Sequence, residues 1–246
     1  MKTLVRAEIL KARTTRSVVA LLAGMLTLVG LAAFGTERSL EASELVGGVA
    51  PELFVTVAAA IVPLFALVLG IRSATDEFRS GSIVPTLLAT PKRWRVIAAK
   101  VVVTSAIGGG FGLAAAGLAA GIGSMLVASE GASVLLAPAS LAWLVAKVAG
   151  VAAVTAVIGL GVGTLIRHQV AAIVGGLMWF LVAENLADGL APAFAKYLPV
   201  HAMNAVVGGP MGTALGVGLG GVLLVAWAVA AVAGGVAALA RRDVVS

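Results

Sequence analysis

Residues 53–71 read LFVTVAAAIVPLFALVLGI, an uncharged run of 19 residues that lies between Glu52 and Arg72. A helix needs about 20 apolar residues to cross the hydrocarbon core of a bilayer, so this run predicts a transmembrane helix. Five further runs along the chain are predominantly apolar and of comparable length. The six predicted spans are 17–36, 53–71, 101–128, 142–166, 169–186 and 212–240. We therefore predict an all-α polytopic membrane protein with one transmembrane domain over residues 1–246.

The composition agrees with this fold class. Hydrophobic residues make up 61% of the chain and charged residues 11%, whereas soluble domains carry about 25% charged residues. The mean hydropathy is +1.11. A water-soluble globular fold is excluded, because this much apolar side chain could not be covered by so few polar residues.

Few residue types are present that could support catalysis. The chain has no cysteine and only two histidines, which argues against disulfides, iron–sulfur clusters, thiolate zinc sites and a multi-histidine metal site. It also lacks the phosphate-binding loop of nucleotide-hydrolysing proteins and the common hydrolase motifs. We therefore predict no catalytic, cofactor-binding or metal-binding residues and no enzyme activity in this chain.

The basic residues are distributed unevenly among the connections between the predicted spans. The net charge of +6 reflects this pattern rather than nucleic-acid binding. With the N-terminus placed in the cytoplasm, 14 of the 17 basic residues lie on the cytoplasmic side, and both termini are cytoplasmic. We expect this orientation in the plasma membrane. The cytoplasmic set is Lys2, Arg6, Lys11, Arg13, Arg16, Arg72, Arg79, Lys92, Arg93, Arg95, Lys100, Arg167, Arg241 and Arg242.

Residues 2–16 are basic and moderately apolar. Val5, Ile9 and Ala12 fall on one narrow stripe of a helix, with basic residues beside it. This pattern predicts an amphipathic helix lying in the cytoplasmic headgroup layer before the first span. The alternative is a disordered basic tail.

Glycines recur at a spacing of four in the predicted spans, in the pairs 108/112, 117/121, 159/163 and 216/220. This spacing allows helix backbones to approach closely in a membrane. With 31 glycines in the chain such pairs also arise by chance, so they indicate packing and no ligand site.

The connection 72–100 is the longest predicted cytoplasmic segment, and it mixes charged with apolar residues. Ile83, Val84, Leu87 and Leu88 recur at helical spacing, which predicts a short helix with an apolar face. An apolar face bordered by charge is typical of a contact site for another protein. A helix lying on the membrane surface is the equally supported alternative.

In this connection Glu77 is followed by Gly81-Ser82, Leu87-Leu88 and Pro91, and then by Lys92-Arg93. This order of residues resembles that of the permease subunits of type 2 ATP-binding-cassette (ABC-2 type) exporters. The resemblance rests on an acidic residue, a Gly-Ser pair, a Leu-Leu pair and a proline, followed by a basic pair. It extends to an elbow-like N-terminal segment, Arg6–Lys11, and to the ending Arg241-Arg242-Asp243. Pro85 departs from the pattern and is expected to shorten or bend the helix. The matching residues are Glu77, Gly81, Ser82, Leu87, Leu88, Pro91, Lys92 and Arg93.

The resemblance implies a mechanism. The ATPase would be a separate subunit that binds ATP and Mg²⁺, and a second permease subunit, identical or paralogous, would complete the exporter. The short helix would be the coupling helix, which docks into a groove of the ATPase. The residues implied in coupling are Glu77, Gly81, Ser82, Ile83, Leu87, Leu88, Pro91 and Arg93.

Polar residues also occur in or near the fourth and fifth spans. In an antiparallel hairpin that turns at His168, Lys147 lies level with Glu184, Asn185 and Asp188. We expect Lys147 to pair with Glu184 or Asp188 near the outer leaflet; the alternative is that it extends alone to the headgroups.

The segment 184–210 is broken by prolines, and the resemblance implies short re-entrant helices there on the outer side. His201, within this segment, is expected to be a polar surface residue rather than a metal ligand.

Two other functions compete with the exporter subunit. An ATP-independent channel or secondary transporter would be expected to show inverted repeats and charges at the bilayer midplane, and no clear repeat is visible. A polytopic membrane enzyme would need a catalytic constellation within the membrane, and the sequence shows none.

Overall fold

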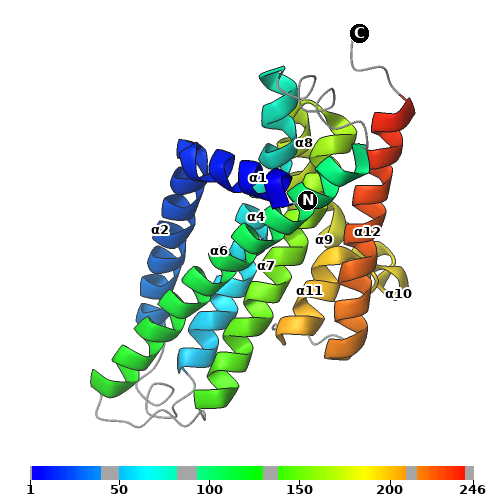
Figure 1. Cartoon of the computed structure of the whole chain (residues 1–246). Coiled ribbons are helices and arrows are strands. Elements are labelled where there is room, and N and C mark those ends of the chain that lie inside the picture. The colour runs from blue at the N-terminus through cyan, green and yellow to red at the C-terminus, as the bar shows by residue number, and fades with distance from the viewer. Residues whose placement is uncertain (1, 40–49, 82–92, 130–137, 209–214, 242–246) are drawn as a thin grey trace.

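The computed structural model describes residues 2–39, 50–81, 93–129, 138–208 and 215–241, and every regular element among them is helical (Figure 1). Among these residues, six helical segments are long and apolar enough to cross a membrane, as many as the spans that the sequence predicts. The fold is that of a helical multi-pass membrane protein. The long segments are α2 (Arg16–Ser39), α4 (Ala50–Arg79), α6 (Arg93–Ser129), α7 (Pro138–Ile166), the continuous α8–η1–α9 (Gln169–Met178, Trp179–Ala183, Glu184–Leu190) and α12 (Val217–Arg241).

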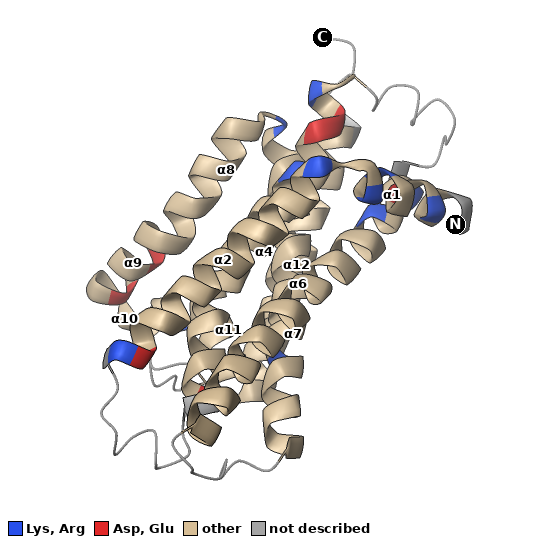
Figure 2. Cartoon of the chain, turned by 90° about the vertical axis from the view of Figure 1, so that its left-hand side faces the viewer, with Lys and Arg blue, Asp and Glu red and all other residues tan. Residues whose placement is uncertain are grey.

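The long segments alternate in direction, so the bundle has two distinct ends. The helix α1 (Lys2–Thr14) lies across one of them, which we call the α1 end, and the last turn of α12 reaches the same end (Figure 1). The short helices α10 (Pro192–Ala195) and α11 (Pro199–Val207) lie toward the other, which we call the α11 end. All described Lys and Arg residues except Arg38, Lys147 and Lys196 belong to the α1 end (Figure 2).

The helices α4, α6 and α7 form the centre of the bundle. In the most apolar 18-residue stretch of each of these helices, 44% to 56% of the residues are buried. In the corresponding stretches of α2, α8–η1–α9 and α12 the share is 17% to 22%. The helix α7 packs against α4, α6, α12, α8 and α11, while α2 packs mainly on α4 and α6. The peripheral helices expose large apolar side chains, which suits contact with lipid.

Glycines bring the central helices into backbone contact. A Cβ atom on Gly159 would overlap the carbonyl oxygen of Leu67, and one on Gly70 would overlap that of Ala156. Close approach through the pair 159/163 is therefore confirmed for α7 and α4, and the pair 108/112 similarly admits the backbone of α7 against α6. Gly117 and Gly121, in contrast, face open space.

Two helices extend well beyond the apolar runs that predicted them. The predicted span 53–71 continues to Arg79 in α4, and the predicted span 101–128 begins at Arg93 in α6. The helices continue past the charged residues that end the apolar runs. Lys100 in the extension of α6 pairs with Glu77 in the extension of α4 and with Glu8 on α1, which stabilises both extensions.

The fifth segment is less regular than the sequence suggests. One turn, η1, is a π-helix, and the chain then continues through α9 to Leu190, past the predicted end at residue 186. The helices α10 and α11 follow within the segment 184–210, where short helices were expected.

The α4–α7 contact predicts a position-specific effect of side-chain size. Gly159→Leu forces a side chain into the backbone of α4. We expect the free energy of unfolding to fall by about 1–3 kcal/mol, as for overpacked cores. Gly150→Leu, on the same helix but facing open space, is the matched control and should leave thermal unfolding of the purified protein unchanged. Equal unfolding temperatures of the two variants would contradict the close contact.

Candidate functional site

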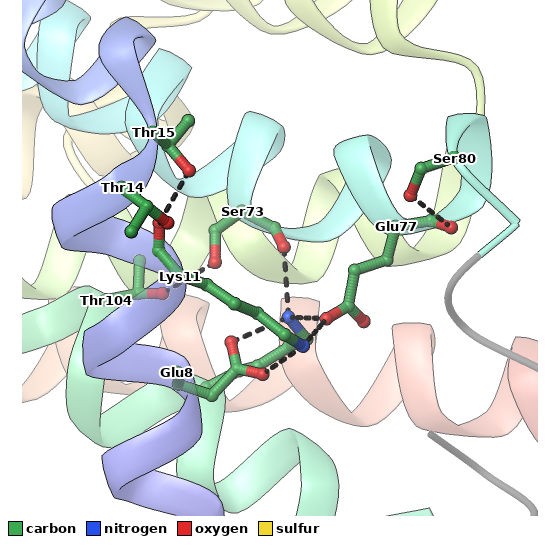
Figure 3. Close-up of polar contacts among 9 residues, drawn as sticks. Glu8, Lys11, Thr14, Thr15, Ser73, Glu77, Ser80 and Thr104 are labelled. Atoms are coloured by element: carbon green, nitrogen blue, oxygen red, sulfur yellow. Dashed lines mark hydrogen bonds and ion pairs between the residues drawn. The ribbon is translucent and has the colours of Figure 1, made fainter. Parts of the chain in front are cut away.

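Four charged side chains from three helices meet at the α1 end and form what we call the charge ring: Glu8, Lys11, Glu77 and Lys100 (Figure 3). Lys11 Nζ lies 2.9 Å from Glu8 Oε1 and 2.6 Å from Glu77 Oε1. Lys100 Nζ lies 2.9 Å from Glu8 Oε2 and 2.9 Å from Glu77 Oε1. Each ammonium therefore contacts both carboxylates, and the two positive charges balance the two negative ones.

The charge ring is largely shielded from solvent. The side chains of Lys100, Glu77 and Glu8 are 6%, 7% and 11% exposed, and only that of Lys11 is half-exposed, at 46%. Lys100 Nζ donates hydrogen bonds to Glu8 Oε2 and, at 3.2 Å, to the carbonyl oxygen of Ser73, and it forms an ion pair with Glu77. Pairing with two carboxylates is what allows an ammonium group to be buried.

The ring joins α1 to two central helices. Glu8 and Lys11 lie one turn apart on α1, whereas Glu77 belongs to α4 and Lys100 to α6. Ser73 and Thr104 add a hydroxyl–hydroxyl hydrogen bond of 3.0 Å between α4 and α6 beside the ring. A cavity of about 210 Å³ lies next to these groups, among α1, α2, α4 and α6.

The pKa values of the two ring residues on α1, Glu8 and Lys11, are shifted by the charges beside them. Burial opposes ionisation of Glu8, but the ammonium groups of Lys100 and Lys11 outweigh it and hold the pKa of the Glu8 carboxyl below its ordinary value of 4.5. Burial likewise opposes the charge of Lys11, but Glu77 and Glu8 outweigh it and raise the pKa of Lys11 above its ordinary value of 10.5.

The charge ring fixes both ends of the segment in which the sequence predicts a coupling helix. Glu77 lies in the last turn of α4, and Gly81 follows with φ +68°, a conformation that glycine adopts without strain. Lys100 lies two turns into α6, which begins at Arg93. The predicted coupling residues Ser82, Ile83, Leu87, Leu88 and Pro91 lie outside the described residues.

Arg167 makes a second connection at the α1 end. It adopts φ +61° in the turn between α7 and α8, and its guanidinium group donates to the carbonyl oxygen of Ala238 at 3.0 Å. The same group lies 5.4 Å from the centre of the Phe78 ring, a cation–π distance. The turn is thereby attached to the ends of both α12 and α4.

At the α11 end, the expected ion pair of Lys147 is wrong. Lys147 Nζ donates to the carbonyl oxygen of Val207 at 3.0 Å, and none of the ion pairs among the described residues includes Lys147. The hairpin register placed α9 beside Lys147, but the last turn of α11 occupies that position. The C-terminal end of a helix carries partial negative charge and therefore attracts an ammonium group.

Glu184, an expected partner of Lys147, and Asn185, expected at the same level, have other partners. Glu184 is 1% exposed and accepts hydrogen bonds from Trp179 Nε1 at 3.1 Å and the backbone N–H of Val200 at 2.8 Å. Asn185 donates to the carbonyl oxygen of Leu181 within its own helix.

His201 is not the surface residue that was expected. Its side chain is 12% exposed and lies between Glu184 and Asp188, with Nε2 3.3 Å from Asp188 Oδ1 and Nδ1 4.0 Å from Glu184 Oε2. Among the described residues no cluster of His, Asp or Glu has the makings of a metal site.

Sequence reasoning missed Glu8 and Lys11 as site residues and treated Lys100 only as the start of a span. One signal was available: Glu8 is the only acidic residue among the first 16, where basic residues dominate. A single opposite charge in such a segment indicates a specific partner. Its partner could not be identified from the sequence, because Lys100 is 92 positions away.

The chain matches no model of a known protein family, and no curated protein is significantly similar to it in sequence.

The charge ring predicts that Lys100 holds α1 in place. Lys100→Met leaves two shielded carboxylates with only the half-exposed Lys11, and breaking buried ion pairs in this way costs about 3–5 kcal/mol. We expect α1 to detach, so that trypsin cleaves the folded protein faster at Lys11 and Arg13. Arg95→Met, which removes an exposed cation from the same helix, is the control, and equal cleavage of the two variants would contradict the role of Lys100.

The pKa shifts predict the pH range over which α1 stays docked. The lowered pKa of Glu8 gives a stabilisation that is present above pH 4.5 and lost as the pH falls through the folded-state pKa. The raised pKa of Lys11 gives a second stabilisation, which is present below pH 10.5 and lost as the pH rises through the folded-state pKa of Lys11.

Spin labels can test this range, because the chain has no cysteine to remove. With Arg13→Cys on α1 and Arg95→Cys on α6, the measured distance distribution should broaden only below pH 4.5 and above pH 10.5. A label pair at Arg79→Cys and Arg95→Cys, which does not involve α1, is the control. Broadening of the first pair near neutral pH would show that the ring does not hold α1.

Proposed function

We propose that this chain is the membrane-spanning permease subunit of an ABC-2 type exporter, which moves a substrate out across the plasma membrane using ATP hydrolysed by a separate subunit. The observation that carries the proposal is the charge ring. Glu77 is the first residue of the motif that resembles the coupling segment, and in this fold it pairs with Lys100 at the other end of that segment and with Lys11 on α1.

This arrangement suits the transmission of force. A load applied to the segment 82–92 reaches α4 and α6 together, since the ring and the Ser73–Thr104 hydrogen bond join their ends. The α1 helix moves with them through Glu8 and Lys11. The backbone contact of α4 with α7 then carries the displacement into the centre of the bundle, because helices in such contact move as a unit.

The proposed orientation follows from the charges. The described basic residues gather at the α1 end, and the cytoplasmic side of a membrane protein carries the excess of Lys and Arg. We therefore propose that the α1 end faces the cytoplasm, since α1 lies there, α12 ends there and α4 and α6 border the coupling segment there. In this orientation α1 would lie in the headgroup layer as the elbow helix. The ATPase, with its ATP and Mg²⁺, would dock at this end, and a second permease subunit would complete the transporter.

Copurification tests the proposal. Tagged protein isolated from its native membrane should bring with it an ATPase that carries a phosphate-binding loop, and Leu87→Asp should reduce the amount by at least about tenfold, as expected when a charge replaces an apolar contact residue. Leu190→Asp, the same change at an 85% exposed leucine at the α11 end, is the matched control and should retain the ATPase.

Thermal unfolding of both variants distinguishes a docking defect from a folding defect. If the wild-type chain isolates without any ATPase, or if Leu87→Asp retains it, the exporter proposal is wrong. Conduction by the purified chain alone in planar bilayers would identify a channel instead.

A further inference from the structure

A groove on the outside of the bundle runs between α7 and α12 and has a volume of about 630 Å³. Among the described residues its lining is apolar except for Lys147. Gly150, Gly218 and Gly221 leave open space where side chains would otherwise fill it. The groove borders α7 from Trp143 to Val154, about 16 Å of helix, which is close to half of a hydrocarbon core of about 30 Å.

The groove continues toward the α1 end. A second apolar cavity of about 410 Å³ shares Val154 and Val225 with it and extends along α12 to Ala233. Trp143, Val222 and Val225 are 64%, 65% and 52% exposed, so the seam opens toward the surroundings of the bundle rather than toward its centre. In a membrane these surroundings are lipid chains.

Lys147 gives the groove a charge at one end. The ammonium group donates one hydrogen bond, to the carbonyl oxygen of Val207, and has two further N–H groups. The C-terminal end of α11 offers only about half of an elementary negative charge, and no described carboxylate forms an ion pair with Lys147. Among the residues that the structure describes, the positive charge at the level of Trp143 therefore has no full counter-charge.

We propose that this groove binds an anionic phospholipid from the leaflet at the α11 end, with the phosphate on Lys147 and an acyl chain along α7 and α12. The phosphate supplies the missing counter-charge and the acceptors for the remaining N–H groups of the ammonium. Trp143, one turn from Lys147 on the same face of α7, has the amphipathic side chain typical of the headgroup level. The site is separate from the charge ring and does not depend on the proposed transport function.

Quenching of Trp143 fluorescence tests the site directly. The protein is reconstituted in phosphatidylcholine that contains a small fraction of brominated phosphatidylglycerol or, in parallel, of brominated phosphatidylcholine. The signal of Trp143 is the difference between the wild-type chain and Trp143→Phe. We expect the anionic probe to be enriched at Trp143 by about fivefold, the effect of one basic residue near an anionic lipid.

Substitutions distinguish the groove from general attraction to basic residues. Lys147→Met should abolish the enrichment, so that the anionic and the zwitterionic probe quench equally. Lys147→Arg should retain the enrichment. Lys196→Met removes another cation near the α11 end but outside the groove, and it should have no effect. Gly221→Leu places a side chain in the open space and should also abolish the enrichment, while thermal unfolding confirms that each variant is folded.

Three results would overturn the proposal. Equal quenching by the two probes in the wild-type chain would show that the site does not select anionic lipid. Unchanged enrichment in Lys147→Met or in Gly221→Leu would place the lipid elsewhere. Absence of quenching by both probes would show that the groove is covered by protein, such as a second copy of the chain.

Discussion

The ammonium group of Lys100 is buried where α1, α4 and α6 meet. It is stable there because Glu8 and the carbonyl of Ser73 accept hydrogen bonds from it and Glu77 forms an ion pair with it. A buried charge of this kind cannot lose a partner without a large cost in free energy. The three helices are therefore held in one arrangement at the α1 end. The coupling role proposed for the segment between α4 and α6 depends on this constraint, because the ring joins the two helices that border that segment.

Within the membrane the helices are held together differently. Lipid chains are as apolar as leucine, so there is little hydrophobic driving force for packing, and helix association depends on close contact. Gly70 and Gly159 provide it between α4 and α7, whose backbones touch. The charge ring is thus connected through rigid backbone contacts to α7, and α7 in turn contacts α6, α8, α11 and α12.

The α11 end has a different electrostatic character. Glu184 and Lys147 lie in the same half of the bundle but do not pair. Glu184 accepts hydrogen bonds from Trp179 and from the N-terminal turn of α11, and Lys147 donates one to the C-terminal carbonyl of Val207. The two ends of one short helix thus receive charges of the sign that each attracts. The α11 helix is thereby fixed by side chains of α7 and α9, while Lys147 retains a positive charge that faces the groove.

Six apolar spans and a concentration of basic residues at one end of the bundle could be predicted from the sequence, because apolar run length and the position of charges are local properties of the chain. Which charges meet depends on how the helices pack in three dimensions. Lys11 contacts Glu77 across 66 positions and Lys147 reaches Val207 across 60, and nothing local specifies either contact. The predicted pair of Lys147 failed because it assumed that α9 lies beside α7, whereas α11 lies there. Interhelical contacts of this kind depend on how side-chain volumes and glycine gaps fit together in three dimensions, which the spacing of residues along the chain does not encode.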